Sequence, residues 1–248
     1  MIVSHTHRFV FIKPRKTAGT SLEVALSASL VSGDFATSIE ADEEFLRPVN
    51  PGVNIGPIRY RAGLLKRRLR DHSPLTQAVD CFGEEILDYR IVTMSRNPWA
   101  RAVSQFYWSN RRTNIRTLEF AERRELFNAY TRKWGPVTWL DKVYGRKRQR
   151  SLNASNLYHF RGKPLAKFAV RFESIDEDLQ DLCTWLEIGS LTMPTKKLKS
   201  GLRGTGVKRW QDYFETDVIE LVRRECAYEI EAFGYTFERE APSKGSRL

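Results

Sequence analysis

The chain has 248 residues, 41% of them hydrophobic, and its 41 Lys and Arg outnumber 30 Asp and Glu, which gives a formal net charge of +11. This length favours one large domain or two small ones, and so basic a balance favours anionic partners without choosing among nucleic acid, acidic lipid, anionic glycan and a phosphorylated cofactor. The three cysteines, Cys81, Cys183 and Cys226, are too few and too scattered for a disulfide framework or a metal site, so a reducing compartment fits best.

The beginning of the chain predicts a strand, a turn and a helix. Its first segment, MIVSHTHRFVFIKP, has no apolar run long enough for a signal peptide, and no later stretch could span a bilayer. We therefore expect a cytoplasmic protein without a membrane span. Phe9 to Ile12 is an unbroken β-prone apolar run, which is typical of a buried strand. From Ser21 the apolar residues follow helical spacing, at Leu22, Ala25, Leu26 and Leu30.

The turn between that strand and that helix, RKTAGTS at 15–21, has the composition of a phosphate-binding loop. A helix N-terminus offers unpaired backbone N–H groups and partial positive charge, and Gly19 allows the backbone to approach an anion closely. Thr17, Thr20 and Ser21 add hydroxyl donors, while Lys16 is placed to reach over the anion. The order differs from the GxxxxGK[ST] of a nucleotide-triphosphate loop. Taken alone, the stretch fits a solvated basic turn equally well.

Residues 33–63 show no sustained period and predict mostly loop, and a strongly basic segment, RYRAGLLKRRLR, follows at 59–70. Long basic side chains most often form a solvated face. As the alternative, they could line a groove for an acidic acceptor. The residues concerned are Arg59, Arg61, Lys66, Arg67, Arg68 and Arg70, with Arg146, Lys147, Arg148 and Arg150 from a later segment.

A second strand is predicted at Tyr89 to Met94, and it runs directly into SRNPWARAVSQFYW. Asn97 suits a helix N-cap and Pro98 suits the first helical position. Arg96 stands at the end of the strand and Ser104 lies one to two turns inside the helix. An arginine can bind a phosphate through two hydrogen bonds and a serine can add one. Alone, the two residues fit a structural ion pair and a surface serine as well.

The rest of the chain continues the alternation of strands and helices. Residues 115–150 predict a basic helical region, and Phe168 to Phe172 predict a third strand. Ser174 and Glu177 have the spacing of a capping box for the helix that follows. A last helix is predicted at about 217–233, with Gly234 just past its end. Its apolar side consists of Ile219, Val222, Cys226, Ile230 and Phe233. This alternation predicts an α/β fold with a central, mainly parallel sheet flanked by helices.

The two motifs together resemble those of the sulfotransferase family that uses 3′-phosphoadenosine-5′-phosphosulfate (PAPS), in its carbohydrate-type and bacterial branch. Lys-Thr-Ala-Gly-Thr-Ser at 16–21 resembles the 5′-phosphosulfate loop, and Arg96-Asn97-Pro98-Trp99 with Arg101 and Ser104 resembles the 3′-phosphate motif. RFESIDEDL at 171–179 and EIEAFGYTF at 229–237 are similar to two further family segments. The resemblance runs from about residue 8 to 238 and implies a nucleotide-loop-like sulfotransferase fold with one domain over residues 1–248.

The resemblance also implies a set of site residues. Lys16 would reach the oxygen that bridges phosphorus and sulfur, where negative charge grows in the transition state. No metal is required, and no metal-ligand cluster stands out in the sequence. The late loop LKSGLRGTGVKRW resembles a cofactor loop, and Arg203 is its candidate contact. The cofactor-binding residues implied in this way are Lys16, Thr17, Ala18, Gly19, Thr20, Ser21, Arg96, Ser104 and Arg203.

Transfer to a hydroxyl needs a group that accepts its proton. Of the four histidines, His5 and His7 precede the first strand and His159 lies in a predicted turn. Related family members carry a histidine before a helix at a position similar to that of His72, which is therefore the candidate base. A carboxylate remains an alternative base. His72 also fits a plain helix-start residue beside a cap at Asp71 or Ser73.

The resemblance thus predicts an enzyme that transfers the sulfuryl group of PAPS to a hydroxyl of a carbohydrate or glycan by in-line displacement. The glycan acceptor follows from the family branch alone. PAPS and such an acceptor are the expected partners, nucleic acid is not, and the oligomeric state stays open. Two other functions remain: a nucleotide-dependent phosphotransferase of related fold, and a non-catalytic polyanion-binding protein.

Overall fold

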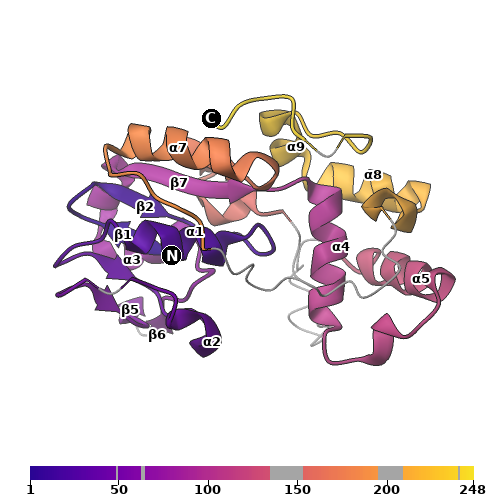
Figure 1. The fold of residues 1–248 in the computed structure, drawn as a ribbon, viewed down its shortest axis with the longest axis horizontal. Coiled ribbons are helices and arrows are strands. Elements are labelled where there is room, and N and C mark those ends of the chain that lie inside the picture. The colour runs from indigo at the N-terminus through magenta and orange to yellow at the C-terminus, as the bar shows by residue number, and fades with distance from the viewer. Residues whose placement is uncertain (49, 63–64, 135–152, 195–208, 240) are drawn as a thin grey trace. The chain divides into compact units, whose positions relative to one another are not determined.

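A computed structural model describes residues 1–248 except 49, 63–64, 135–152, 195–208 and 240 (Figure 1). The chain divides into two compact units. The sheet unit comprises Met1–Ser95, Ser155–Leu198 and Gly245–Leu248, and the helical unit comprises Arg96–Ala154 and Lys199–Lys244. Among the described helices, none combines the length and apolar character needed to cross a membrane.

Six strands form the central sheet of the sheet unit, in the order β10-β7-β2-β1-β3-β4. Three neighbouring pairs are parallel, β10 with β7, β7 with β2 and β3 with β4, while β1 runs antiparallel to β2 and β3. The prediction of an α/β fold with a mainly parallel sheet is therefore confirmed. The strands are β1 (Ile2–Ser4), β2 (Phe9–Phe11), β3 (Phe35–Ala36), β4 (Asn54–Ile55), β7 (Arg90–Ser95) and β10 (Phe168–Arg171).

The sheet is buried on both faces, which explains why its central strands are almost continuously apolar. On one face, alternate residues of β2, β7 and β10 pack with α1 (Gly19–Ser27) and α7 (Ile175–Leu186) into one core. The intervening residues, Val10, Ile91 and Ala169, are buried too, so the opposite face is also covered. The remaining helices of this unit are α2 (Ala41–Glu44) and α3 (Leu75–Phe82), with 3₁₀ turns η1 (Glu84–Asp88), η3 (Ser155–Leu157) and η4 (Phe172–Ser174).

Two small hairpins were not predicted from the sequence. β5 (Arg59–Ala62) pairs with β6 (Leu65–Arg68) where the sequence indicated a basic loop, and β8 (His159–Phe160) pairs with β9 (Lys163–Pro164) where it indicated a turn. Both hairpins are polar and lack the apolar alternation by which strands are recognised.

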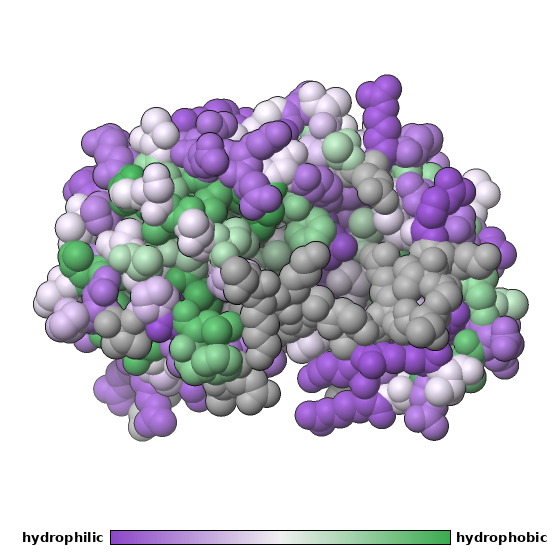
Figure 2. Space-filling view, viewed as in Figure 1, coloured by the Kyte–Doolittle hydropathy of each residue, from purple (hydrophilic) through white to green (hydrophobic). Residues whose placement is uncertain are grey.

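The helical unit contains α4 (Pro98–Ser109), η2 (Asn114–Arg116), α5 (Phe120–Thr131), η5 (Trp210–Tyr213), α8 (Thr216–Glu225) and α9 (Ala227–Phe233). The single helix predicted at 217–233 is wrong, because the backbone leaves helical geometry at Cys226 (φ −111°). Gly234 ends α9 in the left-handed conformation (φ 66°), as predicted. Where α4 passes into α5, hydrophilic side chains cover the surface (Figure 2), and Arg111, Arg112 and Arg116 are exposed there.

The two helix caps predicted from sequence have opposite outcomes. Asn97 caps α4 as predicted, since its side-chain oxygen accepts from the N–H groups of Trp99 (3.1 Å) and Ala100 (3.3 Å). The capping box at Ser174 is wrong, because the Ser174 side chain makes no cap hydrogen bond among the described residues. Instead Asp178 accepts from both the backbone N–H and the Nε of Arg171, each at 2.7 Å. That pair ties the first turns of α7 to the end of β10 and gives the RFESIDEDL segment a structural role.

Candidate functional site

Residues 13–20, from the end of β2 into the first turn of α1, form what we call the anion loop. Lys16 (φ 63°) and Ala18 (φ 64°) both have left-handed backbone conformations, one on each side of Thr17. Non-glycine residues adopt this conformation rarely, and such strain gathers at functional sites. Ala18 is followed at once by Gly19, the first helical residue of α1. A left-handed residue next to helical ones turns successive backbone N–H groups toward a common point, which is the geometry of an anion-binding nest.

The amide groups of this loop lack partners within the protein. Within the described part of the chain, no acceptor is found for the N–H groups of Thr17, Ala18, Gly19 and Thr20, and the first helical bonds run from Ser21 and Leu22 to the Ala18 carbonyl. Three of these four residues are buried, Ala18 being half-buried. Backbone N–H groups of buried residues are rarely left without an acceptor. Their placement at a helix N-terminus provides four donors for a bound anion.

Gly19 is required by close packing in this loop. A Cβ at this position would lie 2.4 Å from Cγ of Lys13 and 3.1 Å from its Cδ. Lys13 cannot readily move away, because its Nζ is fully buried and lies 2.6 Å from Glu23 Oε2. The glycine therefore allows α1 to begin directly beneath the lysine side chain.

The four side chains predicted to bind the anion, those of Lys16, Thr17, Thr20 and Ser21, differ in burial and in hydrogen bonding. The Thr17 hydroxyl donates to the Pro14 carbonyl (3.1 Å), so it stabilises the loop itself. Thr20 and Ser21 are buried in the first turn of α1. Lys16 is half-buried at the left-handed corner of the loop.

A group of buried charges underlies the loop and was missed by the sequence analysis. Glu23, on α1, is fully buried and contacts Lys13 Nζ (2.6 Å), Arg47 Nη2 (3.4 Å) and the Met1 amino group (3.1 Å). These cations hold the pKa of the Glu23 carboxyl below its usual value, although burial alone would raise it. Lys13 Nζ also lies 3.6 Å from Asp71 Oδ2. A signal was present, since Glu23 interrupts the apolar face of a helix and Lys13 directly follows a buried strand.

His72 lies against the start of the anion loop. Its Nδ1 is 2.8 Å from the backbone oxygen of Lys13, and its Nε2 is 3.2 Å from Oδ2 of Asp71. Since a carbonyl oxygen only accepts, Nδ1 carries the proton in this contact, and Nε2 is the nitrogen at which a further proton is gained or lost. The structure thus brings together His72 and the loop, which are more than fifty residues apart in sequence.

The environment keeps the imidazole neutral near neutral pH. Burial lowers the pKa of His72 to about 4, and the Asp71 carboxylate opposes that shift. Against the effect of burial, the pKa of Asp71 is itself lowered by the protonated form of His72 and by the Lys13 charge. A neutral His72 with an unprotonated Nε2 can accept a proton, and the adjacent Asp71 would stabilise the imidazolium that forms.

Arg96 and Ser104 belong to the helical unit. Arg96 precedes the Asn97 cap of α4 and is half-buried, and Ser104 is half-buried on the same helix. The cap is anchored further, because Asn97 Nδ2 donates to the backbone oxygens of Thr236 (3.1 Å) and Arg239 (3.0 Å). Arg101 of the same motif pairs with Glu229 in the interior at 2.6 Å, so its role in the fold is structural.

Several predicted residues lie outside the described residues: Arg203, the candidate contact in the late loop, and the basic residues Arg146, Lys147, Arg148 and Arg150. Among the described residues, no group of three His, Cys, Asp or Glu side chains is placed to hold a metal ion.

No protein-family model, curated protein or solved structure matches this chain.

Proposed function

We propose that the protein is a PAPS-dependent sulfotransferase that transfers the sulfuryl group to a hydroxyl of a carbohydrate. The observation that carries the proposal is the contact of His72 with Lys13, which joins a neutral, half-buried histidine to a loop with four unpaired backbone donors. A proton acceptor beside an anion-binding loop is what transfer from an anionic donor to a hydroxyl requires.

The described residues fit the 5′ end of such a nucleotide. The loop amides and the close approach at Gly19 suit a phosphate group, and Lys16 supplies a charge at the same loop. When bound, PAPS would supply the sulfuryl group that is transferred. Lys16 would stabilise the negative charge that develops on the leaving oxygen, and His72 Nε2 would take the proton of the acceptor hydroxyl. By the sequence resemblance, Arg96 and Ser104 would hold the 3′-phosphate.

Ligand-dependent stabilisation tests the nucleotide specificity. Adenosine 3′,5′-bisphosphate should raise the Tm of the protein without Mg²⁺, since a ligand that binds only the folded state stabilises it. Stabilisation by Mg-ATP alone would favour the phosphotransferase alternative instead. Transfer of labelled sulfate from PAPS onto fractionated carbohydrate acceptors then tests the reaction itself, and an absence of transfer to every fraction would count against it.

Two substitutions test the proposed roles. Lys16→Ala should lower the transfer rate more than it weakens binding of adenosine 3′,5′-bisphosphate, because the lysine acts mainly on charge that develops during transfer. Arg96→Ala should weaken that binding about tenfold or more, because it removes a charge-assisted contact. Lys163→Ala and Arg112→Ala, at exposed positions, are the matched controls. Equal losses of rate and binding in Lys16→Ala would reduce Lys16 to a plain phosphate contact.

A further inference from the structure

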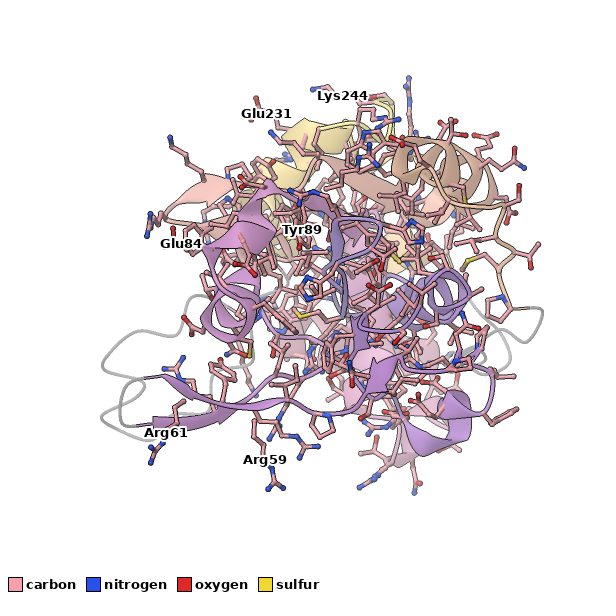
Figure 3. All side chains as sticks on the ribbon, turned by 90° about the vertical axis from the view of Figure 1, so that its left-hand side faces the viewer. Arg59, Arg61, Glu84, Tyr89, Glu231 and Lys244 are labelled. Carbon is pink, nitrogen blue, oxygen red and sulfur yellow. The ribbon has the colours of Figure 1, made fainter. Side chains whose placement is uncertain are left out.

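The β5–β6 hairpin and the residues after it carry an unusual concentration of arginine. An open groove of about 900 Å³ is lined by Tyr60, Gln77 and five arginines. We call these arginines the arginine hairpin: Arg59, Arg61, Arg67, Arg68 and Arg70. All five are exposed, and Figure 3 shows Arg59 and Arg61 extending from β5 toward solvent.

The strand register places like charges opposite each other. Arg59 pairs with Arg68, so this cross-strand pair is cationic on both strands. The Leu69 N–H donates to the Ile58 oxygen (2.8 Å), which makes the adjacent Arg59–Arg68 pair a non-hydrogen-bonded one, in which side chains come closest. Like charges directly opposite destabilise a hairpin. A bound anion would relieve that repulsion.

Several exposed arginines of this protein have acidic partners, which the five arginines of the hairpin lack among the described residues. Within the described residues, no carboxylate forms an ion pair with any of the five, whereas Arg132 pairs with Glu215 and Asp217, and Arg161 pairs with Glu84. Within the part of the chain that the structure describes, the charge of the groove is therefore uncompensated. Arginine binds carboxylate, sulfate and phosphate through paired hydrogen bonds, so this groove suits a ligand with several such groups.

The hairpin leads directly to the candidate base. β6 ends at Arg68, the buried Leu69 anchors the chain, and Arg70 and Asp71 precede His72. All these residues belong to the sheet unit. An extended ligand that lies along the arginines would thus have a neighbouring part near the imidazole.

We infer that the arginine hairpin binds the acidic groups of an anionic glycan and, resting on the proposed function, that this glycan is the acceptor. A single-stranded nucleic acid fits less well, because its recognition depends on exposed aromatic rings that stack on bases. Among the described residues that line the groove, Tyr60 is the one aromatic, and it is half-buried with a buried hydroxyl.

Calorimetric titration of the full chain with polygalacturonate, neutral dextran and an oligothymidylate, at one ionic strength and without nucleotide, tests the inference. The triple variant Arg59→Gln, Arg61→Gln, Arg68→Gln should bind polygalacturonate at least about tenfold more weakly than the wild type, because three charged contacts are lost. The control, Arg111→Gln, Arg112→Gln, Arg116→Gln, changes the net charge equally at exposed arginines of the helical unit. It should change the affinity less than about threefold.

Equal losses in the two triple variants would overturn the inference, since binding would then follow total charge. Binding of dextran as tight as that of polygalacturonate, or tighter hairpin-dependent binding of the oligothymidylate, would overturn it as well. The result of this binding experiment can be told apart from the test of the proposed function. Hairpin-dependent binding of polygalacturonate would support the glycan site even if adenosine 3′,5′-bisphosphate failed to bind, and that failure would count against the sulfotransferase proposal alone.

Discussion

Lys13 connects the parts of the candidate site at the scale of single residues. Its side chain covers Gly19, its Nζ contacts Glu23, and its backbone oxygen accepts from His72. A buried ion pair of this kind is expensive to break, because one charge is then left without its partner. The positions of the loop and the histidine are therefore linked through one residue.

Gly19→Ala tests the packing beneath Lys13. The added methyl group would lie 2.4 Å from Cγ of Lys13, whose far end is fixed by Glu23. We expect a loss of about 1–3 kcal/mol in the free energy of unfolding, measured by urea denaturation, together with weaker binding of adenosine 3′,5′-bisphosphate. Gly189→Ala is the matched control, because nothing lies within 4 Å of a Cβ there. A Gly19→Ala variant with wild-type stability and affinity would contradict the described packing.

The pH dependence of stability tests the environment of His72. Its pKa falls from 6.5 to about 4 on burial, so between these pH values the unfolded chain takes up a proton that the folded chain does not. The free energy of unfolding should therefore decrease as the pH falls from 6.5 toward 4. His72→Asn should show a smaller decrease in urea denaturation across this window. A wild-type profile that matches that of His72→Asn would show that the imidazole is not desolvated.

The lowered pKa of His72 also changes the expected pH dependence of the transfer rate. If His72 is the base, the acid limb of the rate profile should lie near pH 4 rather than 6.5, where a carboxylate would also titrate, so the limb alone does not identify the base. The Asp71→Asn variant distinguishes a histidine base from a carboxylate base. Removing a carboxylate that favours the imidazolium should move the limb to still lower pH and slow transfer. An unchanged limb in Asp71→Asn, with near-normal turnover in His72→Ala, would remove His72 from the reaction.

At the scale of elements, the Asn97 cap joins the start of α4 to the segment that follows α9. Asn97→Ala removes an acceptor for two helix N–H groups and two donors to the Thr236 and Arg239 oxygens. Loss of the cap alone should lower the free energy of unfolding by about 0.5–2 kcal/mol. Loss of the two hydrogen bonds to the carbonyl oxygens should lower it further. Asn97→Asp keeps the cap acceptor and loses the donors, so urea denaturation should place it between wild type and alanine. Equal losses in both variants would show that the cap contributes nothing.

The predicted and missed elements differ in how local their determinants are. The strand before the anion loop, the start of α1 and the cap of α4 were predicted because each depends on neighbouring residues: an apolar run, a glycine turn and an Asn-Pro pair. The β5–β6 hairpin was missed because its strands are cationic, and the break at Cys226 was missed because the apolar stripe continues through it. Ser174 and Glu177 have the spacing of a capping box without the cap bond, and it is Asp178 that ties the start of α7 to Arg171.

The candidate site likewise has features that depend on neighbouring residues and features that depend on distant ones. The loop composition from Lys16 to Ser21 could be read locally and His72 was nominated by the family resemblance, but the contact of His72 with Lys13 depends on chain folding across distant residues. Glu23, Lys13 and Asp71 form a charge group that no short motif encodes. Sequence patterns thus supplied candidate site residues, while their mutual placement required tertiary structure.

At the scale of the whole molecule, the net charge of +11 raises the question whether anions bind one surface or the protein as a whole. Binding that displaces counterions weakens with salt, and the slope of log affinity against log salt reflects the number of charged contacts. Both arginine triple variants reduce the net charge from +11 to +8, since each removes three cations. A difference between their slopes therefore reflects where the removed charges lie and not how many were removed.

We expect polygalacturonate titrations between low and physiological salt to give a steep slope for the wild type. The slope should decrease by roughly one to three for Arg59→Gln, Arg61→Gln, Arg68→Gln, because each removed contact releases about one counterion fewer. The Arg111→Gln, Arg112→Gln, Arg116→Gln variant should keep a slope close to that of the wild type. Binding spread over the whole basic surface would instead lower both slopes equally, and the arginine hairpin would then be one part of a diffuse cationic field rather than a defined site.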